Sequence, residues 1–571
     1  MARPAPRVAQ VSEADQSPGA VRTVGDRPVR TGGGIDRLAR DGLLGLVGAA
    51  ASAVLNLVLV IVVVRAAGKS TAGVVFAVTS LYLIAVTFSR LGSPTGLVYF
   101  LVRARTHGDV PSIRKIMRTG VVPVVVASFV VAAVLMVWAP GLASWIAPKR
   151  AADAVGPIRI LALLVPVAAL SDTLLMGSRG FNTMRPLIVV ERIARPVGQV
   201  VLTLLAILIG TKTAAAFTSA WALPYVATAA VAAWWTRGLV RRAVRRGRRR
   251  GALIDPVDVV DRKPVTPREY WFFTAPRGLQ SIVQIALQRL DVVLVSAILG
   301  PKEAAIYAAV TRFLVFGQLG AQAITTAVQP QLGALLFSGD RKGAGVVYQV
   351  STCWLVLLTW PVYLGLAVFS RQIPSFFGSG YDSGTAVLII LAGAMLVATG
   401  SGLVDVVLAM AGRTTWTLGN SSLALVVDVT LNVILLPRIG IMGAAVAWAA
   451  AIVCNNVLPV TQLAVALRLH PFGRGSVLAM LSAAGWLGLL PATAALLLGW
   501  TAPVVGVAFA LGIAGYLGTA WRLRDPFDLD ALLRAGRRRV AAQPRETVAA
   551  SGGTDADGAD SVQAGETESW S

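Results

Sequence analysis

The sequence LLGLVGAAASAVLNLVLVIVVV, residues 43–64, contains no charged residue, and its only polar side chains are those of Ser52 and Asn56. A helix that crosses the hydrocarbon core of a bilayer needs about 20 predominantly apolar residues, so this stretch is long enough to span a membrane. Comparable runs recur as far as Thr519, and about fourteen of them can be distinguished. The pattern predicts an all-α, polytopic membrane protein with about 14 transmembrane helices.

The composition excludes most other classes of protein. Of the 571 residues, 56% are hydrophobic and 14% are charged, whereas charged residues make up about 25% of a typical soluble domain. The chain therefore does not have the composition of a cytosolic enzyme. Its two cysteines, Cys353 and Cys454, lie in separate apolar runs, and its two histidines, His107 and His470, are isolated. These residues predict no disulfide framework, no metal site and no cofactor.

The net charge of +24 would suit a nucleic-acid-binding protein if the basic residues formed one patch. Most of the lysines and arginines instead fall on alternate loops, with the largest groups before Leu43, between Arg237 and Arg268, and after Thr519. Because cytoplasmic loops of membrane proteins carry such an excess, we expect both termini to lie in the cytoplasm and the protein to span the cell (plasma) membrane. The arginine-rich run 241–250 is then an anchor at the anionic inner leaflet, and no nucleic-acid partner is expected.

Charge and hydropathy divide the chain into a cytoplasmic arm, an N-terminal six-helix bundle, a basic linker, a C-terminal six-helix bundle, two extra helices and a cytoplasmic tail. In that order, the parts cover residues 1–41, 42–236, 237–269, 270–467, 476–521 and 522–571. The arm lacks the apolar segment of a signal peptide. The polar composition of the arm, and of the acidic end of the tail, predicts that both are disordered.

The two six-helix bundles carry weak signs of an internal repeat. Gly68 is matched by Gly300, and the Gly-Asp pair at 108–109 by the same pair at 339–340, at a nearly constant offset of about 230 residues. A repeat with an even number of spans gives parallel copies related by a pseudo-two-fold axis along the membrane normal, with a central cavity that opens alternately to either side. The alternative is a duplicated scaffold with a closed, dry core, which should lack buried polar stripes.

Polar stripes occur in the first two runs of the second bundle. In the run Phe273–Leu299, five polar residues share a face about 80° wide at 100° per residue. They are Arg277, Gln280, Gln284, Gln288 and Asp291. Arg289 lies on the opposite side, about 16 Å from the end at Gly300 and therefore near the middle of the membrane. The next run carries Tyr307, Thr311, Gln318 and Gln322 on one face, with Arg312 about 120° from Gln318.

An arginine at the middle of a bilayer costs about 2.5–3.5 kcal/mol or more, so it needs a partner or a water-filled cavity. Two interpretations remain open. Asp291 could form an internal ion pair with Arg277 or Arg312 that only locks the helices together. Alternatively, the stripes line a wet cavity in which the arginines bind an anionic head group and the glutamines bind sugar hydroxyls. The first bundle offers Arg90 as its best candidate for the same site.

Signals of an enzyme are weak. Residues Gly68-Lys69-Ser70-Thr71 resemble the end of a phosphate-binding P-loop, but the position that requires the first glycine of that motif is Val63. The predicted external loops contain only Asp153, Glu303 and Asp382 as acids, so they offer no carboxylate pair for glycosyl transfer. The sequence therefore predicts neither a nucleotide site nor an enzyme.

Several short motifs of the second bundle form a recognisable set. They are Asp291–Gly300, Ala304–Arg312, Gln329-Pro330, Phe377–Tyr381 and the segment Gly440-Ile-Met-Gly443. Together they resemble the polysaccharide flippases of the multidrug/oligosaccharidyl-lipid/polysaccharide exporter superfamily, and the resemblance covers nearly all of Leu43–Thr519. It implies that the protein moves a lipid-linked oligosaccharide, an undecaprenyl-pyrophosphate-sugar, from the inner to the outer leaflet for polysaccharide or cell-wall glycan biosynthesis. By the same analogy, Arg277, Arg289 and Arg312 are the candidates to hold the pyrophosphate.

Three alternatives remain open. A lipid II flippase of the same superfamily also fits the predicted number of spans. A cation-coupled drug exporter of the same fold would favour acids in the cavity, and Asp291, Asp405 and Asp428 keep it open. A non-transporting membrane scaffold that gathers glycan-synthesis enzymes through the basic linker is the alternative from another class. The expected partners are the lipid-linked oligosaccharide and membrane lipids, with glycan-synthesis enzymes as further candidates.

Overall fold

The computed structural model describes residues 32–106, 109–251 and 265–529. Within these ranges every regular element is helical, and 12 helical segments are long and apolar enough to cross a membrane. The prediction of an all-α, polytopic membrane protein is therefore confirmed.

The first half of the molecule is built from the helices before the basic linker, together with one π-helical segment, η3. In chain order they are α1 (Gly32–Ser89), α2 (Ser93–Thr106), α3 (Val110–Val137), α4 (Ala139–Ile146), α5 (Ala151–Gly177), η3 (Leu187–Ala194), α6 (Arg195–Leu208), α7 (Ala214–Ala222) and α8 (Pro224–Gly251). Short 3-10 turns, η1 (Pro148–Arg150) and η2 (Ser178–Phe181), precede and follow α5.

The second half and the extra helices follow the linker. The second half comprises α9 (Pro267–Ile298), α10 (Pro301–Thr311), η5 (Arg312–Leu314), α11 (Val315–Phe337), α12 (Arg341–Val368), η6 (Ile373–Phe377), α13 (Gly384–Gly400), α14 (Val404–Met410), α15 (Thr414–Ile439) and α16 (Ile441–Leu467). The extra helices are α17 (Arg474–Ala483), the π-helical η7 (Ala484–Leu489), α18 (Leu490–Leu498) and α19 (Ala502–Arg522).

The 12 segments match the predicted apolar runs except at two places. Gly68 has non-helical dihedrals inside α1 (φ 75°, ψ 161°), so two predicted runs share one continuous segment, Gly45–Thr106. The run Pro196–Ile209, which is short for a span, is extended by the π-helical turns of η3 and does not count among the 12 segments. Every other predicted run lies on one segment.

The positions matched by the sequence repeat have matching conformations. Gly68 bends the chain between the first two spans of the first half, and Gly300 (φ 108°) lies between α9 and α10 in the second half. Positive φ angles of this kind favour glycine because a Cβ would be strained there. Asp109 caps α3 by accepting from Ser112 N, and Asp340 caps α12 by accepting from Gly343 N. Each half thus begins with a bent pair of spans followed by an Asp-capped helix.

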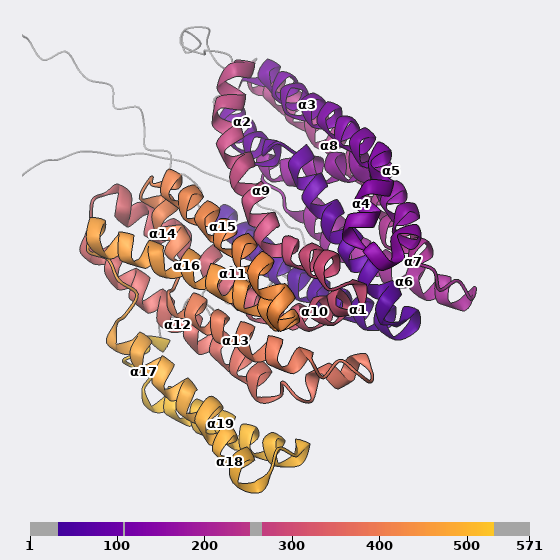
Figure 1. Ribbon diagram of the computed structural model, residues 1–571. Coiled ribbons are helices and arrows are strands. Elements are labelled where there is room, and N and C mark those ends of the chain that lie inside the picture. The colour runs from indigo at the N-terminus through magenta and orange to yellow at the C-terminus, as the bar shows by residue number, and fades with distance from the viewer. Residues whose placement is uncertain (1–31, 107–108, 252–264, 530–571) are drawn as a thin grey trace, which may run out of the picture.

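The two halves lie side by side, and the extra helices lie at the edge of the second half (Figure 1). Within the first half, α1 packs on α5, and across the halves it contacts α9 and α10. The largest cluster of buried apolar side chains accordingly draws on both halves, from Leu59 in α1 to Ala445 in α16. The extra helices are attached through α17, which packs on α12.

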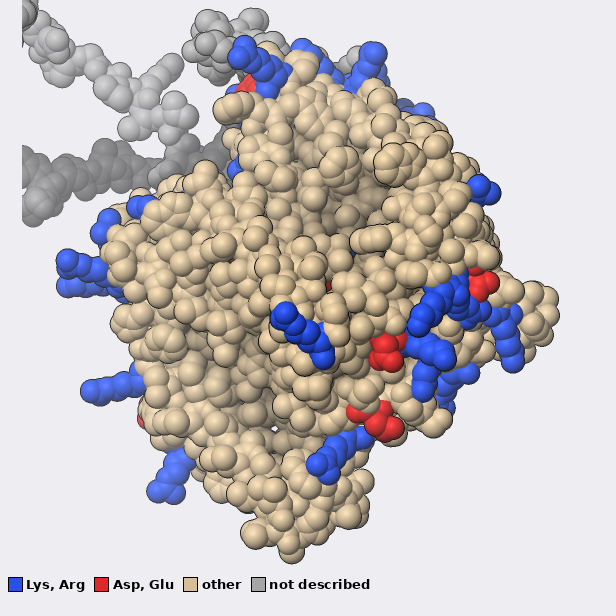
Figure 2. Space-filling model, viewed as in Figure 1, with Lys and Arg blue, Asp and Glu red and all other residues tan. Residues whose placement is uncertain are grey.

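The surface fits a bilayer. Figure 2 shows most charged side chains toward opposite edges of the viewed face, with a largely uncharged surface between them. Large apolar side chains are exposed along the predicted spans, including Phe129, Trp234 and Leu497. Contiguous exposed apolar surface of this kind is normal only where lipid or another protein covers it.

The predicted arm and linker differ in part from the structure. Helix α1 already begins at Gly32, inside the predicted arm 1–41, and α8 continues to Gly251, inside the predicted linker 237–269. The arginine-rich run therefore extends a membrane helix by several turns instead of starting a loop. Residues 1–31, 252–264 and 530–571, which hold the rest of the arm, the linker and the tail, lie outside the described residues.

Candidate functional site, a cationic cavity between the halves

A cavity of about 400 Å³ lies between the two halves. At about 30 Å³ per water in the liquid, it has room for roughly a dozen water molecules. Its lining comes from α1, η3, α6, α7 and α8 of the first half and from α9, η5 and α11 of the second. The lining residues are Ala49, Ser52, Ala53, Asn56, Leu57, Leu83, Glu191, Arg192, Arg195, Pro196, Gln199, Trp221, Tyr225, Arg289, Arg312, Val315 and Leu319. A smaller cavity of about 90 Å³ shares Asn56, Leu83, Trp221, Arg289 and Arg312 with it.

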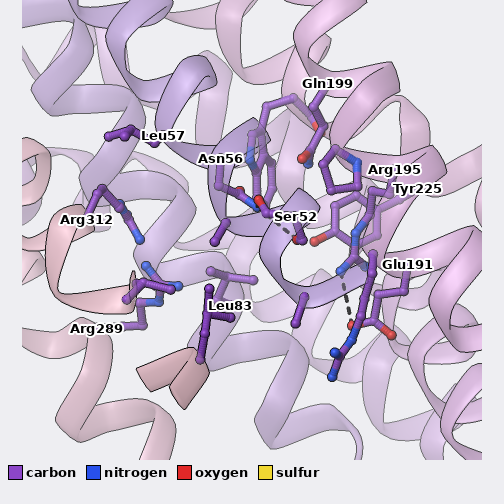
Figure 3. A pocket seen from close by; sticks show the side chains of 17 residues that line it. Ser52, Asn56, Leu57, Leu83, Glu191, Arg195, Gln199, Tyr225, Arg289 and Arg312 are labelled. Carbon is purple, nitrogen blue, oxygen red and sulfur yellow. Dashed lines mark hydrogen bonds and ion pairs between the residues drawn. The ribbon is translucent and has the colours of Figure 1, made fainter. Parts of the chain in front are cut away.

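Two arginines of the second half point into this cavity from one side. Arg289 projects from α9, and Arg312 stands at the 3-10 turn η5 that joins α10 to α11. Figure 3 shows both guanidinium groups directed toward the same part of the cavity. The Nε atom of each is buried without a hydrogen-bond partner among the described residues. Neither residue belongs to an ion pair in the described part of the chain.

The opposite wall carries charges that are already paired. Arg195 donates from Nη1 to Asp172 Oδ1 and from Nη2 to Glu191 Oε1, each at 3.2 Å. Its guanidinium carbon also lies 4.7 Å from the centre of the Tyr225 ring. Asp172 Oδ2 accepts from Arg90 Nη1 at 3.4 Å. These contacts fix the Arg195 side chain within the first half, and Figure 3 shows the contact with Glu191.

The π-helical segment η3 sets the position of this wall. A π-helical turn contains more residues than an α-helical one, so it changes the direction in which the following side chains point, and such turns are frequent at functional sites. Here η3 ends at Ala194 and carries Glu191 and Arg192 into the lining, directly before Arg195. Arg192 Nη1 donates to Gly45 O of α1 at 2.6 Å, which ties η3 to the first span.

The remaining polar lining consists of neutral side chains of the first half. Asn56 Nδ2 donates to Ser52 O at 2.7 Å, within α1. Gln199 Nε2 donates to Trp221 O at 2.9 Å, which joins α6 to α7. Both side chains are therefore oriented by bonds within the first half, and the cavity is bordered by polar groups of several kinds.

Most of the predicted stripe on α9 lies outside both cavities. Gln280 and Gln284 donate from Nε2 to Ser421 Oγ on α15, each at 3.3 Å. Arg277 donates to Phe273 O at 2.8 Å, and its guanidinium lies 3.7 Å from the centre of that ring. Gln288 is exposed. Gln280 and Gln284 thus face α15 of their own half, and the role of the stripe in substrate binding stays a prediction.

Asp291 and Tyr307 belong to a buried polar cluster inside the second half. Asp291 accepts from Tyr307 Oη at 2.8 Å and from Asn432 Nδ2 at 3.2 Å. Asn432 Nδ2 also lies 3.1 Å from Asp428 Oδ1. None of these residues lines either cavity. The ion pairs of the described residues do not include Asp291, so the proposed lock with Arg277 or Arg312 is wrong.

The other predicted residues are also placed away from the cavity lining. The Thr311 hydroxyl donates to Ala308 O at 3.1 Å, and Gln318 and Gln322 are exposed. Arg90 does not line either cavity and donates to Asp172 and to Thr87 Oγ1. Of the twelve candidates, the structure therefore brings Arg289 and Arg312 together in the cavity and leaves the others elsewhere.

Sequence reasoning missed the whole first-half wall, including Asn56, Glu191, Arg195, Gln199 and Tyr225. Arg192 and Arg195 read as ordinary charges of a cytoplasmic loop because the apolar run that follows them begins at Pro196. The shortness of that run was the available signal. A span of normal length needs the preceding residues, and including them moves Glu191 and Arg195 into the membrane.

The halves touch at both ends of the cavity. Near the bend of α1, Lys69 Nζ donates to Gly380 O and Arg65 Nε to Phe376 O, each at 3.0 Å. At the other end, Gly92 and Gly278 approach so closely that a Cβ on either would clash with backbone of the other half. The cavity is therefore bounded by contacts between the two halves.

Comparison with known proteins agrees with this architecture. A family model described as "Polysaccharide biosynthesis protein" matches residues 38–335, which is more than half of the chain. The chain belongs to this polysaccharide biosynthesis protein family. A second model, described as "MatE", matches residues 276–434. A curated relative, the "Probable low-salt glycan biosynthesis flippase Agl15" of Haloferax volcanii, is 30% identical over 177 residues, a match that spans 30% of this chain and only 36% of that relative.

Solved structures show the same fold at low identity. "Lipid II flippase MurJ, inward closed conformation" superposes with a TM-score of 0.62 at 13% identity, covering 85% of this chain and 99% of that one. An inward-facing multidrug resistance MATE transporter of the MOP superfamily gives a TM-score of 0.54 at 13% identity, covering 77% and 96%. The chain is thus a multi-pass membrane protein of the polysaccharide biosynthesis protein family, and it shares the fold of these two transporters.

Proposed function

We propose that this member of the polysaccharide biosynthesis protein family flips a lipid-linked oligosaccharide, an undecaprenyl-pyrophosphate-sugar, from the inner to the outer leaflet for polysaccharide or cell-wall glycan biosynthesis. The observation that carries the proposal is the pair Arg289 and Arg312, which line the cavity without an acidic partner among the described residues. Arginine forks match the oxygens of a pyrophosphate and hold it by charge-assisted hydrogen bonds.

The cavity solves the physical problem of such a substrate. A pyrophosphate-sugar head cannot cross hydrocarbon unaided, whereas its polyprenyl tail is at home in lipid. A head group held between α1 of the first half and α11 of the second could move while the tail stays outside. Rocking of the two halves about the bound head would then exchange the side to which the cavity opens, which is alternating access.

The orientation in the membrane is part of the proposal. Both termini lie in the cytoplasm of a cell (plasma) membrane in this scheme, because the basic loops favour the cytoplasmic side. The cavity would then load its substrate from the leaflet in which lipid-linked sugars carry their head groups inward. Glycan-synthesis enzymes that supply this lipid are the candidate partners.

The test uses purified protein in proteoliposomes and a fluorescent undecaprenyl-pyrophosphate-oligosaccharide whose head group is measured in each leaflet. The double variant Arg289→Ala, Arg312→Ala should flip at least about 100-fold more slowly, because each arginine supplies charge-assisted hydrogen bonds of about 1.5–3 kcal/mol. The matched control is Arg277→Ala, because Arg277 lies outside the cavity and stacks on Phe273. Flipping by the double variant at the wild-type rate would contradict the proposal.

A second candidate is a cation-coupled drug exporter of the same fold. It is favoured by the buried acids Asp291 and Asp428 and by the "MatE" match over residues 276–434. The same vesicles distinguish the two candidates when a lipophilic cation replaces the labelled lipid. Uptake of the cation driven by an ion gradient, without flipping of the lipid, would favour the exporter. Flipping of lipid II alone would identify a lipid II flippase, and no transport of either would favour a scaffold.

A further inference from the structure

The two walls of the cavity differ in hydrogen-bonding character. The second half contributes Arg289, Arg312, Val315 and Leu319, so its polar groups are donors only. The first half contributes both donors and acceptors, and its acceptor oxygens include those of Asn56, Glu191 and Gln199. We call Asn56, Glu191 and Gln199 of the first half the acceptor wall.

Glu191 provides the clearest unused acceptor. Its Oε1 accepts from Arg195 at 3.2 Å, while its Oε2 is buried and has no partner among the described residues. Figure 3 shows this side chain at the edge of the cavity beneath Arg195. A buried carboxylate oxygen without a donor is costly, so it favours a ligand that brings one.

The two amide side chains of the acceptor wall also present oxygen atoms that can accept a hydrogen bond. Asn56 and Gln199 donate from their nitrogens to Ser52 O and Trp221 O, which orients each side chain, and neither amide oxygen accepts a hydrogen bond from a described residue. The basic residues of the same wall do not reverse this character. Arg192 donates to Gly45 O, and Arg195 is held by Asp172 and Glu191.

A single ligand must satisfy both walls. A pyrophosphate has acceptor oxygens and no donor at neutral pH, so it matches Arg289 and Arg312 and leaves Glu191 unsatisfied. A lipophilic cation would satisfy Glu191 and leave the two arginines unpaired. A sugar attached to the pyrophosphate supplies hydroxyl and amide donors next to the anion. The ring of Trp221, which also lines the cavity, offers an apolar face on which a sugar ring can pack.

We propose that the acceptor wall binds the sugar next to the pyrophosphate and selects a neutral or N-acetylated sugar over an acidic one. The inference rests on the proposed function and adds that the two halves bind different parts of the ligand. A uronic acid at this position would bring its carboxylate toward Glu191, where two acids repel each other. Specificity then depends on the first half, whereas binding of the anion depends on the second.

The experiment compares binding of undecaprenyl pyrophosphate, which has no sugar, with undecaprenyl-pyrophosphate-N-acetylglucosamine in nanodiscs. Asn56→Leu and Glu191→Gln should each weaken binding of the sugar-bearing lipid by about tenfold, as expected for loss of a hydrogen bond at a buried polar site. The sugar-free lipid should bind each variant at least as tightly as the wild type. This binding also reports that the variant is folded. Gln318→Leu, a polar-to-apolar change at an exposed position outside the cavity, is the control and should change neither affinity.

The outcomes separate this inference from the proposed function. Equal weakening of both lipids, or no weakening of either, would overturn the assignment of the acceptor wall. A wild-type preference for a glucuronic acid derivative over the N-acetylglucosamine lipid would overturn the selectivity. The proposed function itself fails on a different result, namely unchanged binding of the sugar-free lipid by the variant Arg289→Ala, Arg312→Ala. Because Asn56 and Glu191 lie on different elements, failure of one variant to insert leaves the other as the test.

Discussion

The arginines of the two cavity walls differ in whether they are bonded to acids. In the first half, Arg195 is bonded to Asp172 and Glu191, and Arg90 shares Asp172 with it. In the second half, Arg289 and Arg312 face the same cavity with buried Nε atoms that no described residue satisfies. A paired arginine is neutralised and serves the protein, whereas an unpaired one is costly until an anion arrives. Thus the position of the acids, and not the number of arginines, distinguishes the structural cations from those available to a ligand.

The largest effect is expected when an acid is introduced into the cavity wall of the second half, as is found in the wall of the first half. Arg312→Glu would place an acid beside Arg289 and create a pair like that of Arg195 with Glu191. Lipid flipping should fall by at least about 100-fold, because one ligand cation is lost and the other is neutralised. The melting temperature of the detergent-solubilised protein should stay the same or rise, since two like charges become an ion pair.

A matched variant tests the geometry of that site. Arg312→Lys keeps the charge but loses the fork that fits two phosphate oxygens, so its flipping rate should lie between those of the wild type and Arg312→Glu. A melting temperature that falls sharply in Arg312→Glu would show instead that the two arginines support the fold, and the contrast between the walls would be lost.

The second-largest effect is expected when an acid is removed from the network of charges in the first half. Asp172 is bonded to both Arg90 and Arg195, and its side chain is 14% exposed. Asp172→Asn should lower the free energy of unfolding by about 3 kcal/mol, because removal of one partner leaves mostly buried charges uncompensated. The measurement is thermal unfolding in detergent. The matched control is Asp153→Asn, which removes the acid of the exposed pair Arg150–Asp153 and should cost about 0–1 kcal/mol. Equal stability of the two variants would mean that the first-half network is not structural.

Much of the fold could be predicted because it depends on the hydrophobic effect over long stretches. Nearly every apolar run is long enough to be identified as a membrane span by itself. The internal repeat also predicted that Gly68 and Gly300 are equivalent, and both lie at bends. The exception is η3, where charged residues enter the span and the apolar run is too short to be read alone. A local change from α-helical to π-helical geometry depends on packing against other spans, which one segment of sequence does not contain.

The site could be predicted only in part, because helical periodicity gives relative directions and not absolute ones. The α9 face with Gln280, Gln284 and Asp291 was correctly recognised as polar, but polarity does not reveal whether a face meets water or another polar helix. Helix α15 carries Ser421, Asp428 and Asn432, which satisfy that face inside the second half. Arg289 on the other side of α9 is the residue that reaches the cavity.

The smallest effect is expected on this polar face of α9. Gln284 and Gln280 both donate to Ser421 Oγ, so Gln284→Leu removes one neutral hydrogen bond and leaves Ser421 with its other donor. A neutral hydrogen bond contributes about 0.5–1.5 kcal/mol, and the added apolar contact offsets part of it, so unfolding should change by less than about 1 kcal/mol and lipid flipping should not change. Gln199→Leu is the same replacement on the acceptor wall and should slow flipping of a sugar-bearing lipid. If both variants slow flipping equally, then the α9 face meets the substrate at another stage of the transport cycle, and the division between a structural face and a ligand wall would have to be redrawn.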